Sequence, residues 1–132
     1  MATLIVNGAY FDVEPGSRLV LDIEENGVRI GHRCGGKGEC TTCRVKFFEG
    51  EPEVMTMAEF ERLHLEGLYG QVRLSCQIEV DHTMSVKPLM TAENQPEWNG
   101  DTGPEPDEIV EPEAIWYPKK LLEEEFEQSG GE

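Results

Sequence analysis

The sequence predicts a small α+β domain with a mixed sheet, followed by an acidic, proline-rich tail. Three observations support this. β-rich segments alternate with two short amphipathic helical patterns, these patterns do not repeat as regular βαβ units, and the apolar periodicity ends near residue 90. We therefore expect a domain over residues 1–90 and an acidic extension over residues 91–132, in which residues 118–128 can form a short docked helix.

The first elements expected are a hairpin and a short helix. Ala2–Val6 and Tyr10–Val13 are rich in β-forming residues and flank Asn7-Gly8, a dipeptide that favours a tight hairpin turn. Ser17 is expected to cap the helix, and Asn26-Gly27 supplies a left-handed stop at its end. The inward face of this helix would carry Leu19, Val20 and Ile23.

A glycine-rich loop follows, and then the remaining elements. Residues 44–47 alternate as a third strand, and Thr56-Met57-Ala58-Glu59 has the form of a capping box at the start of a second helix. Residues 72–80 alternate strictly between apolar and polar side chains, which predicts a half-buried strand. This alternation points the Cys76 side chain inward, and residues 83–86 could return beside the strand. The second helix would bury a stripe made of Met57, Phe60, Leu63 and Leu68.

Composition excludes several classes of partner. The chain has 132 residues, of which 27 are acidic and 11 basic, for a formal net charge of -16. Such a charge repels phosphate backbones and anionic lipid surfaces, so we expect neither nucleic acid nor membrane as a partner. No apolar run approaches the roughly 20 residues that span a bilayer, and the N-terminus has no basic segment before its apolar stretch. We expect a cytoplasmic monomer.

The four cysteines carry the strongest chemical signal. Cys34, Cys40, Cys43 and Cys76 are spaced C-x5-C-x2-C-x32-C, and in a reducing compartment they are expected to be metal ligands or redox groups rather than disulfides. Four thiolates fill the outer valences of two irons bridged by two sulfides, and three glycines between the first two cysteines allow backbone N–H groups to point at an anionic centre. Structural zinc usually shows two C-x2-C pairs, whereas this chain has one. A zinc-dependent interaction module remains an alternative.

The segments from His32 to Val45 and from Arg73 to Gln77 resemble the plant-type [2Fe-2S] ferredoxin family. The similarity covers about residues 1–90 and is strongest to the branch with a C-G-G-x-G-x-C-x-x-C cluster loop. The resemblance implies a β-grasp (ubiquitin-like) fold, a [2Fe-2S] cluster near the surface, and one-electron transport between redox proteins. It places the ligands of the cluster at Cys34, Cys40, Cys43 and Cys76.

We therefore interpret the chain as a soluble one-electron carrier that is not an enzyme by itself. Its partners would be a reductase or another oxidoreductase with a basic docking face. Glu59, Glu61 and Glu66 on the second helix are candidates for that contact. An alternative within redox biology is an electron-relay subunit bound in a larger complex through the acidic tail. His32 is expected to occupy an ordinary loop position.

Overall fold

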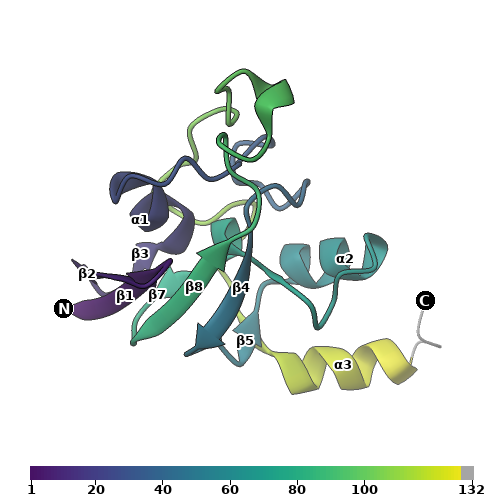
Figure 1. Ribbon diagram of the computed structural model, residues 1–132. Helices are drawn as coiled ribbons and strands as arrows, with labels where there is room; N and C mark the ends of the chain where they lie inside the picture. The colour runs from purple at the N-terminus through teal and green to yellow at the C-terminus, as the bar shows by residue number, and fades with distance from the viewer. Residues whose placement is uncertain (129–132) are drawn as a thin grey trace.

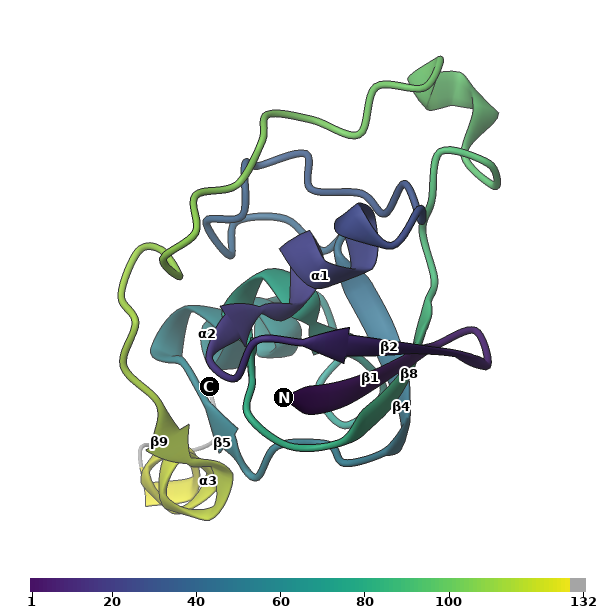
Figure 2. The same cartoon turned by 90° about the vertical axis from the view of Figure 1, so that its left-hand side faces the viewer.

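The computed structural model describes residues 1–128 and contains a five-stranded mixed sheet in the order β2-β1-β8-β4-β6. β1 runs parallel to β8, and the other neighbouring strands are antiparallel. Helix α1 (Leu19–Glu25) lies against one face of this sheet, and α2 (Met57–Leu65) lies beyond its β4–β6 edge (Figures 1 and 2). The α+β class is therefore confirmed. The sheet strands are β1 Ala2–Val6, β2 Ala9–Val13, β4 Arg44–Glu49, β6 Arg73–Leu74 and β8 Met84–Pro88.

The N-terminal hairpin and α1 (Leu19–Glu25) follow local sequence signals closely. Asn7 and Gly8 both have positive φ, at 51° and 83°, which is the geometry that a tight two-residue hairpin turn requires. α1 ends before Asn26 and Gly27, as predicted. The expected cap was wrong: the N-cap residue is Arg18, while Ser17 donates its hydroxyl hydrogen bond to Asp22 instead.

The predicted strand over residues 72–80 is interrupted. β6 ends at Leu74, a 3-10 turn (η1, Ser75–Gln77) follows, and β7 (Glu79–Val80) pairs with β3 (Ser17–Arg18) in a separate two-stranded sheet. The interruption has a tertiary cause, because the Ser75 backbone N–H and its hydroxyl both donate to the carbonyl oxygen of Cys43, at 3.2 and 2.8 Å. Cys76 is nevertheless fully buried, as expected. β8 pairs with β1 and β4 rather than beside residues 72–80.

Helix α2 (Met57–Leu65) begins with half of the predicted capping box. The Thr56 hydroxyl accepts a hydrogen bond from the backbone N–H of Glu59 at 3.2 Å, so the predicted N-cap is confirmed. The Glu59 carboxylate does not return to Thr56, because it binds Arg73 instead. Phe60 and Leu63 are buried in the core as predicted, whereas Met57 is 38% exposed and Leu68 lies beyond the end of the helix.

Residues 91–128 wrap around the domain in an extended path (Figure 2). They pass a single 3-10 turn (η2, Pro96–Trp98), pair β9 (Tyr117–Pro118) with β5 (Val54–Met55), and end in α3 (Lys119–Gln128). α3 packs beside α2, because the Phe126 ring lies 4.4 Å from the His64 ring and 5.8 Å from the Phe60 ring, centroid to centroid. Within the described residues, no helix is both long and apolar enough to cross a membrane.

Candidate metal centre

The loop between α1 and β4 brings three cysteines to the turn that carries the fourth. Cys34, Cys40 and Cys43 lie in this loop, and Cys76 lies in η1. Cys43 and Cys76 are buried at 1% and 0% exposure, whereas Cys34 and Cys40 are partly exposed. The four sequence-predicted site residues are therefore gathered at one place, with one half of the group facing outward.

The four thiols form two pairs. The Cys40 thiol donates a hydrogen bond to the Cys34 sulfur, which lowers the pKa of Cys34 to about 4 and raises the pKa of Cys40. The Cys43 thiol donates to the Cys76 sulfur in the same way, which raises the pKa of Cys43 and lowers the pKa of Cys76. Repulsion between Cys34 and Cys76, and between Cys40 and Cys43, couples the two pairs electrostatically.

The loop backbone forms a set of donors around the outer pair. The backbone N–H groups of Lys37, Glu39 and Cys40 donate to the Cys34 sulfur. Gly36, at φ 82°, also permits a close approach, since a Cβ atom there would lie 2.7 Å from the Arg18 guanidinium. Three N–H groups directed at one sulfur stabilise negative charge on it. This cradle fits an anionic metal–sulfur group.

A buried cation supports the loop from behind, and sequence reasoning missed it. Arg18 is 1% exposed, and its guanidinium donates to the carbonyl oxygens of Cys76 (2.8 Å), Gly36 and Asp107 (2.6 Å). It therefore links the fourth cysteine, the glycine loop and the tail, and its charge helps to lower the pKa of Cys76. No local pattern identifies Arg18, because its three partners are remote in sequence.

Gln77 is a second supporting residue that the sequence did not reveal. Its side-chain amide donates to the Glu111 carbonyl oxygen at 2.6 Å and lies 3.6 Å from the Cys76 sulfur, while its side-chain oxygen accepts from Thr56 at 2.7 Å. The residue thus connects the cysteine turn to the start of α2 and to the tail. Residues 101–111 run along the outside of the cysteine loop through these contacts.

Glu59 is part of this support and not part of a docking surface. It is 0% exposed, and its carboxylate accepts from Arg73 Nε at 2.7 Å, Arg73 Nη2 at 3.1 Å and the Leu74 backbone N–H at 2.8 Å. The expectation that Glu59 faces a partner was therefore wrong. Glu61 and Glu66 are exposed, and Glu66 pairs with Arg62 one turn earlier.

His32 lies in the loop before the first cysteine, as expected, but it is buried there. Its side chain is 1% exposed, and its Nε2 atom lies 3.0 Å from Glu24 Oε1. The other ring nitrogen, Nδ1, is buried without a hydrogen-bond partner among the described residues. The hydrogen bond between the Glu105 and Glu24 carboxyl groups raises the pKa of Glu105. The three side chains form a second polar cluster, distinct from the cysteines.

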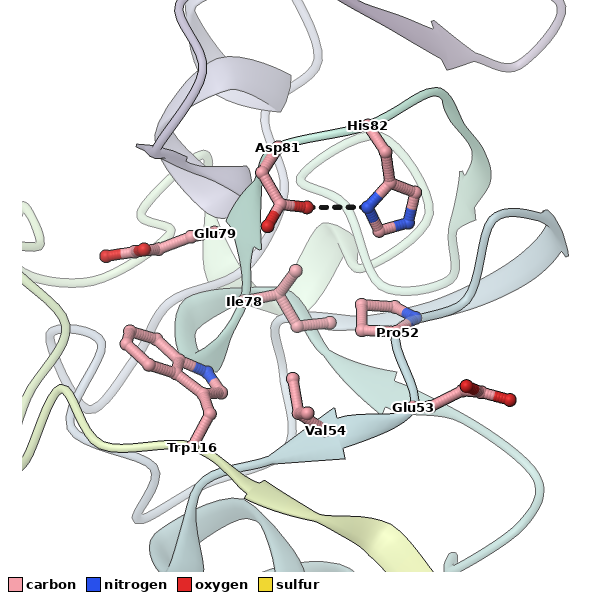
Figure 3. A pocket seen from close by; sticks show the side chains of 8 residues that line it. All are labelled: Pro52, Glu53, Val54, Ile78, Glu79, Asp81, His82 and Trp116. Atoms are coloured by element: carbon pink, nitrogen blue, oxygen red, sulfur yellow. Dashed lines mark hydrogen bonds and ion pairs between the residues drawn. The ribbon is translucent and has the colours of Figure 1, made fainter.

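A hollow of about 320 Å³ is lined by Ile78 and Glu79, the two residues that follow the cysteine turn (Figure 3). Trp116 forms one wall, and its indole N–H donates to the Gln77 carbonyl oxygen at 2.9 Å. Glu79 and Asp81 stand at the rim, where burial and the charge of Asp81 raise the pKa of Glu79. The apolar floor is formed by Pro52, Val54 and Ile78.

The donor set fits two metal ions better than one. A single zinc ion at about 2.3 Å from four sulfurs would hold every pair of sulfurs about 3.8 Å apart. Within residues 1–128, however, the sole trio of His, Cys, Asp or Glu ligand atoms that all lie within 4.8 Å of one another is Glu24, His32 and Glu105. No three cysteine sulfurs are that close. Two thiol pairs in an N–H cradle match two irons with two thiolates each.

Comparison with known proteins gives one family match, described as a 2Fe-2S iron-sulfur cluster binding domain, over residues 4–81. Among curated relatives, one component of the Na(+)-translocating NADH-quinone reductase of Chlamydia felis is 33% identical over 90 residues, which are 67% of this chain and 20% of that protein. The corresponding component in Methylococcus capsulatus is 32% identical over 84 residues, 63% of this chain and 20% of that protein. The chain thus matches about a fifth of these relatives.

Two solved structures share the fold. The ISC-like [2Fe-2S] ferredoxin from Pseudomonas putida superposes with a TM-score of 0.56 at 23% identity, over 66% of this chain and 91% of that chain. A chain of the covalent putidaredoxin reductase–putidaredoxin complex gives a TM-score of 0.53 at 26% identity, over 66% of this chain and 97% of that chain. These neighbours confirm the expected β-grasp arrangement.

Proposed function

The chain belongs to the 2Fe-2S iron-sulfur cluster binding domain family, and from this premise we propose that Cys34, Cys40, Cys43 and Cys76 are the ligands of its cluster. The protein is a [2Fe-2S] electron carrier rather than an enzyme. In the proposed arrangement, Cys34 and Cys40 hold one iron and Cys43 and Cys76 hold the other. The pairwise contact of the thiols is the observation that supports this assignment.

The chain's own groups would set the properties of the centre. When bound, the cluster supplies reversible storage of one electron. The N–H groups directed at Cys34 and the buried guanidinium of Arg18 both favour additional negative charge, so they raise the reduction potential relative to a site without them. Burial of Cys43 and Cys76 keeps water from the inner half of the site.

We further propose that electrons enter and leave on the side of Cys34 and Cys40, because these two ligands are the partly exposed ones. The partner would be a redox protein with a basic docking face, since the chain has a net charge of -16. Glu61 and Glu66, which are exposed on α2, are the candidates for the acidic contacts in this proposal. Raising the ionic strength should slow electron transfer, and a rate insensitive to salt contradicts this docking proposal.

The relatives favour a second candidate, an electron-relay subunit bound in a larger complex. Two of them are named as subunits of an NADH-quinone reductase, and their matched region is a fifth of their length. In this proposal residues 91–132 attach the protein to the complex. We also propose that the cysteine loop belongs to the ferredoxin branch with the pattern C-G-G-x-G-x-C-x-x-C, and that the protein works in the cytoplasm. Stable co-purification with a multi-subunit oxidoreductase would favour the relay over the free carrier.

The ligand assignment is tested on anaerobically purified full-length protein. We expect visible absorption, two irons and two acid-labile sulfides per chain, and an electron paramagnetic resonance signal after reduction with dithionite. Each of the variants Cys34→Ser, Cys40→Ser, Cys43→Ser and Cys76→Ser should lose or destabilise the cluster. A colourless protein with one zinc ion, or a cluster unchanged by Cys76→Ser, refutes the assignment.

The proposed boundary at residue 90 has its own test. Deleting residues 91–132 should leave the visible spectrum unchanged, because all four cysteines lie within residues 1–90, and should weaken partner binding. It should also lower thermal stability, since the hydrogen bonds from Arg18 and Gln77 to the tail are lost. Loss of the cluster would show that the domain extends beyond residue 90.

A further inference from the structure

A second set of possible metal ligands lies outside the cysteine centre and joins three distant segments. Glu24 comes from α1, His32 from the loop that precedes the first cysteine, and Glu105 from the tail. One ligand atom of each lies within 4.8 Å of the other two, and the distance from His32 Nε2 to Glu24 Oε1 is 3.0 Å. We propose that these three side chains bind a divalent transition-metal ion of the zinc class, and that the ion fastens the tail to the domain.

The histidine is built into the fold in a way that suits a ligand. Its side chain is 1% exposed, and its own backbone N–H donates to the Thr102 carbonyl oxygen at 2.8 Å. Its carbonyl oxygen accepts from the Gly35 N–H, also at 2.8 Å. These contacts fix the backbone that carries the ring, and Nε2 faces Glu24, with the Thr102 hydroxyl also 3.3 Å from it. Nδ1 is the buried ring atom without a partner, and it can carry the proton while Nε2 binds an ion.

The charges of the Glu24, His32 and Glu105 side chains favour a cation. Glu24 and Glu105 place two carboxyl groups in hydrogen-bond contact in a protein of net charge -16. Within residues 1–128, neither carboxylate has an ion pair with lysine or arginine, and the histidine is the single basic group against them. A bound divalent cation would neutralise both carboxylates at once, which one shared proton cannot do.

The donor set indicates the class of ion. Magnesium and calcium prefer shells made of oxygen atoms, whereas imidazole nitrogen together with carboxylate oxygen suits zinc and its neighbours in the first transition row. Three protein ligands leave one position of a tetrahedron for solvent. Glu105 is exposed, so that position can face water.

Such an ion would act on the tail and not on the thiols. Without it, the Glu105 side chain contacts Glu24 and lies close to His32. Residues 101–111 already contact the domain through the carbonyl oxygens of Thr102, Asp107 and Glu111, and the ion would add a further link between them at Glu105. The expected consequence is a tail that resists proteolysis when the ion is bound. This inference does not rest on the proposed electron-transfer function.

The test uses full-length protein that carries its cluster. Zn²⁺ is titrated anaerobically by calorimetry while visible absorption is recorded, and metals are counted after gel filtration. We expect one zinc ion per chain in addition to two irons, with the visible spectrum retained. Glu105→Gln should weaken zinc binding at least about tenfold. Glu113→Gln is the matched control, because Glu113 is an exposed glutamate of the same tail that is not one of the three proposed zinc ligands. It should bind zinc as the parent does.

Limited proteolysis measures how firmly the tail is held, and this measurement does not depend on the absorption of the iron-sulfur cluster. Zinc should slow cleavage of the tail in the parent and in Glu113→Gln, and should leave the cleavage rate of Glu105→Gln unchanged. The proposal is overturned if the parent retains no additional zinc, or if the two glutamine variants bind it equally. It is also overturned if zinc enters only as the visible absorption bleaches, because the thiols are then its ligands.

Discussion

Replacing Glu59 by glutamine should strongly destabilise the protein, because the change removes a negative charge from a buried ion pair. The carboxylate is 0% exposed and accepts three hydrogen bonds, two from Arg73 at 2.7 and 3.1 Å and one from the Leu74 backbone at 2.8 Å. Removing one member of a buried ion pair typically costs about 3–5 kcal/mol. Arg73 would keep Glu51 at 3.4 Å and two backbone carbonyl oxygens as partners, so we expect a loss at the lower end of this range. For a chain of this length, that loss corresponds to a fall in melting temperature of about 10 °C or more.

Thermal unfolding followed by circular dichroism at one fixed scan rate measures this change, and bleaching of visible absorption measures loss of the cluster in parallel. Glu61→Gln is the control, because Glu61 is an exposed residue on the same helix; its melting temperature should stay close to that of the parent. Combining Glu59→Leu with Arg73→Met should recover part of the loss, since no buried charge then remains. A Glu59→Gln variant that melts within about 2 °C of the parent refutes this reasoning.

Two further predictions concern the cysteine loop and pH. Gly36→Ala should accelerate bleaching of the cluster, because the new Cβ would lie 2.7 Å from the Arg18 guanidinium; Gly67→Ala, also at positive φ but with open space around it, should leave the bleaching rate unchanged. The His82 pKa is raised by its hydrogen bond to a backbone carbonyl and by Asp81, so its contribution to stability is complete below about pH 6.5 and is lost as pH rises through the raised value. The difference in melting temperature between the parent and His82→Gln should therefore shrink from pH 6 to pH 8; a constant difference contradicts it. With the side chain 46% exposed, we expect an effect of only a few tenths of a kcal/mol.

The segments that sequence reasoning predicted well are governed by short-range preferences. Asn7 and Gly8 belong to the residue types that most readily adopt positive φ, as a tight hairpin turn requires. The Thr56 hydroxyl caps α2 by accepting a hydrogen bond from the backbone N–H three residues later. The grouping of three cysteines around glycines within ten residues has the same character. In each case the interacting groups lie within about ten residues of one another along the chain, so the residue types and their spacing indicate the local structure.

The errors arose where a partner distant in sequence decides the conformation. Residues 72–80 alternate as a strand would, yet Ser75 turns to bind the Cys43 carbonyl and η1 replaces the middle of the strand. In the sequence Glu59 looks like a solvated helix residue, but in the structure it is buried and pairs with Arg73, 14 residues away. His32 becomes buried because residues of the tail cover the loop in which it lies.

The sequence by itself determined the α+β class, the hairpin, the capped start of α2 and the cysteine spacing that indicates a metal–sulfur centre. The tertiary structure alone decided that the thiols meet as two pairs, that Arg18 lies behind them, and that Glu24, His32 and Glu105 converge. The physical reason is the range of the interactions. Backbone preferences act over a few residues, whereas burial of a charge or a thiol depends on which remote groups satisfy it.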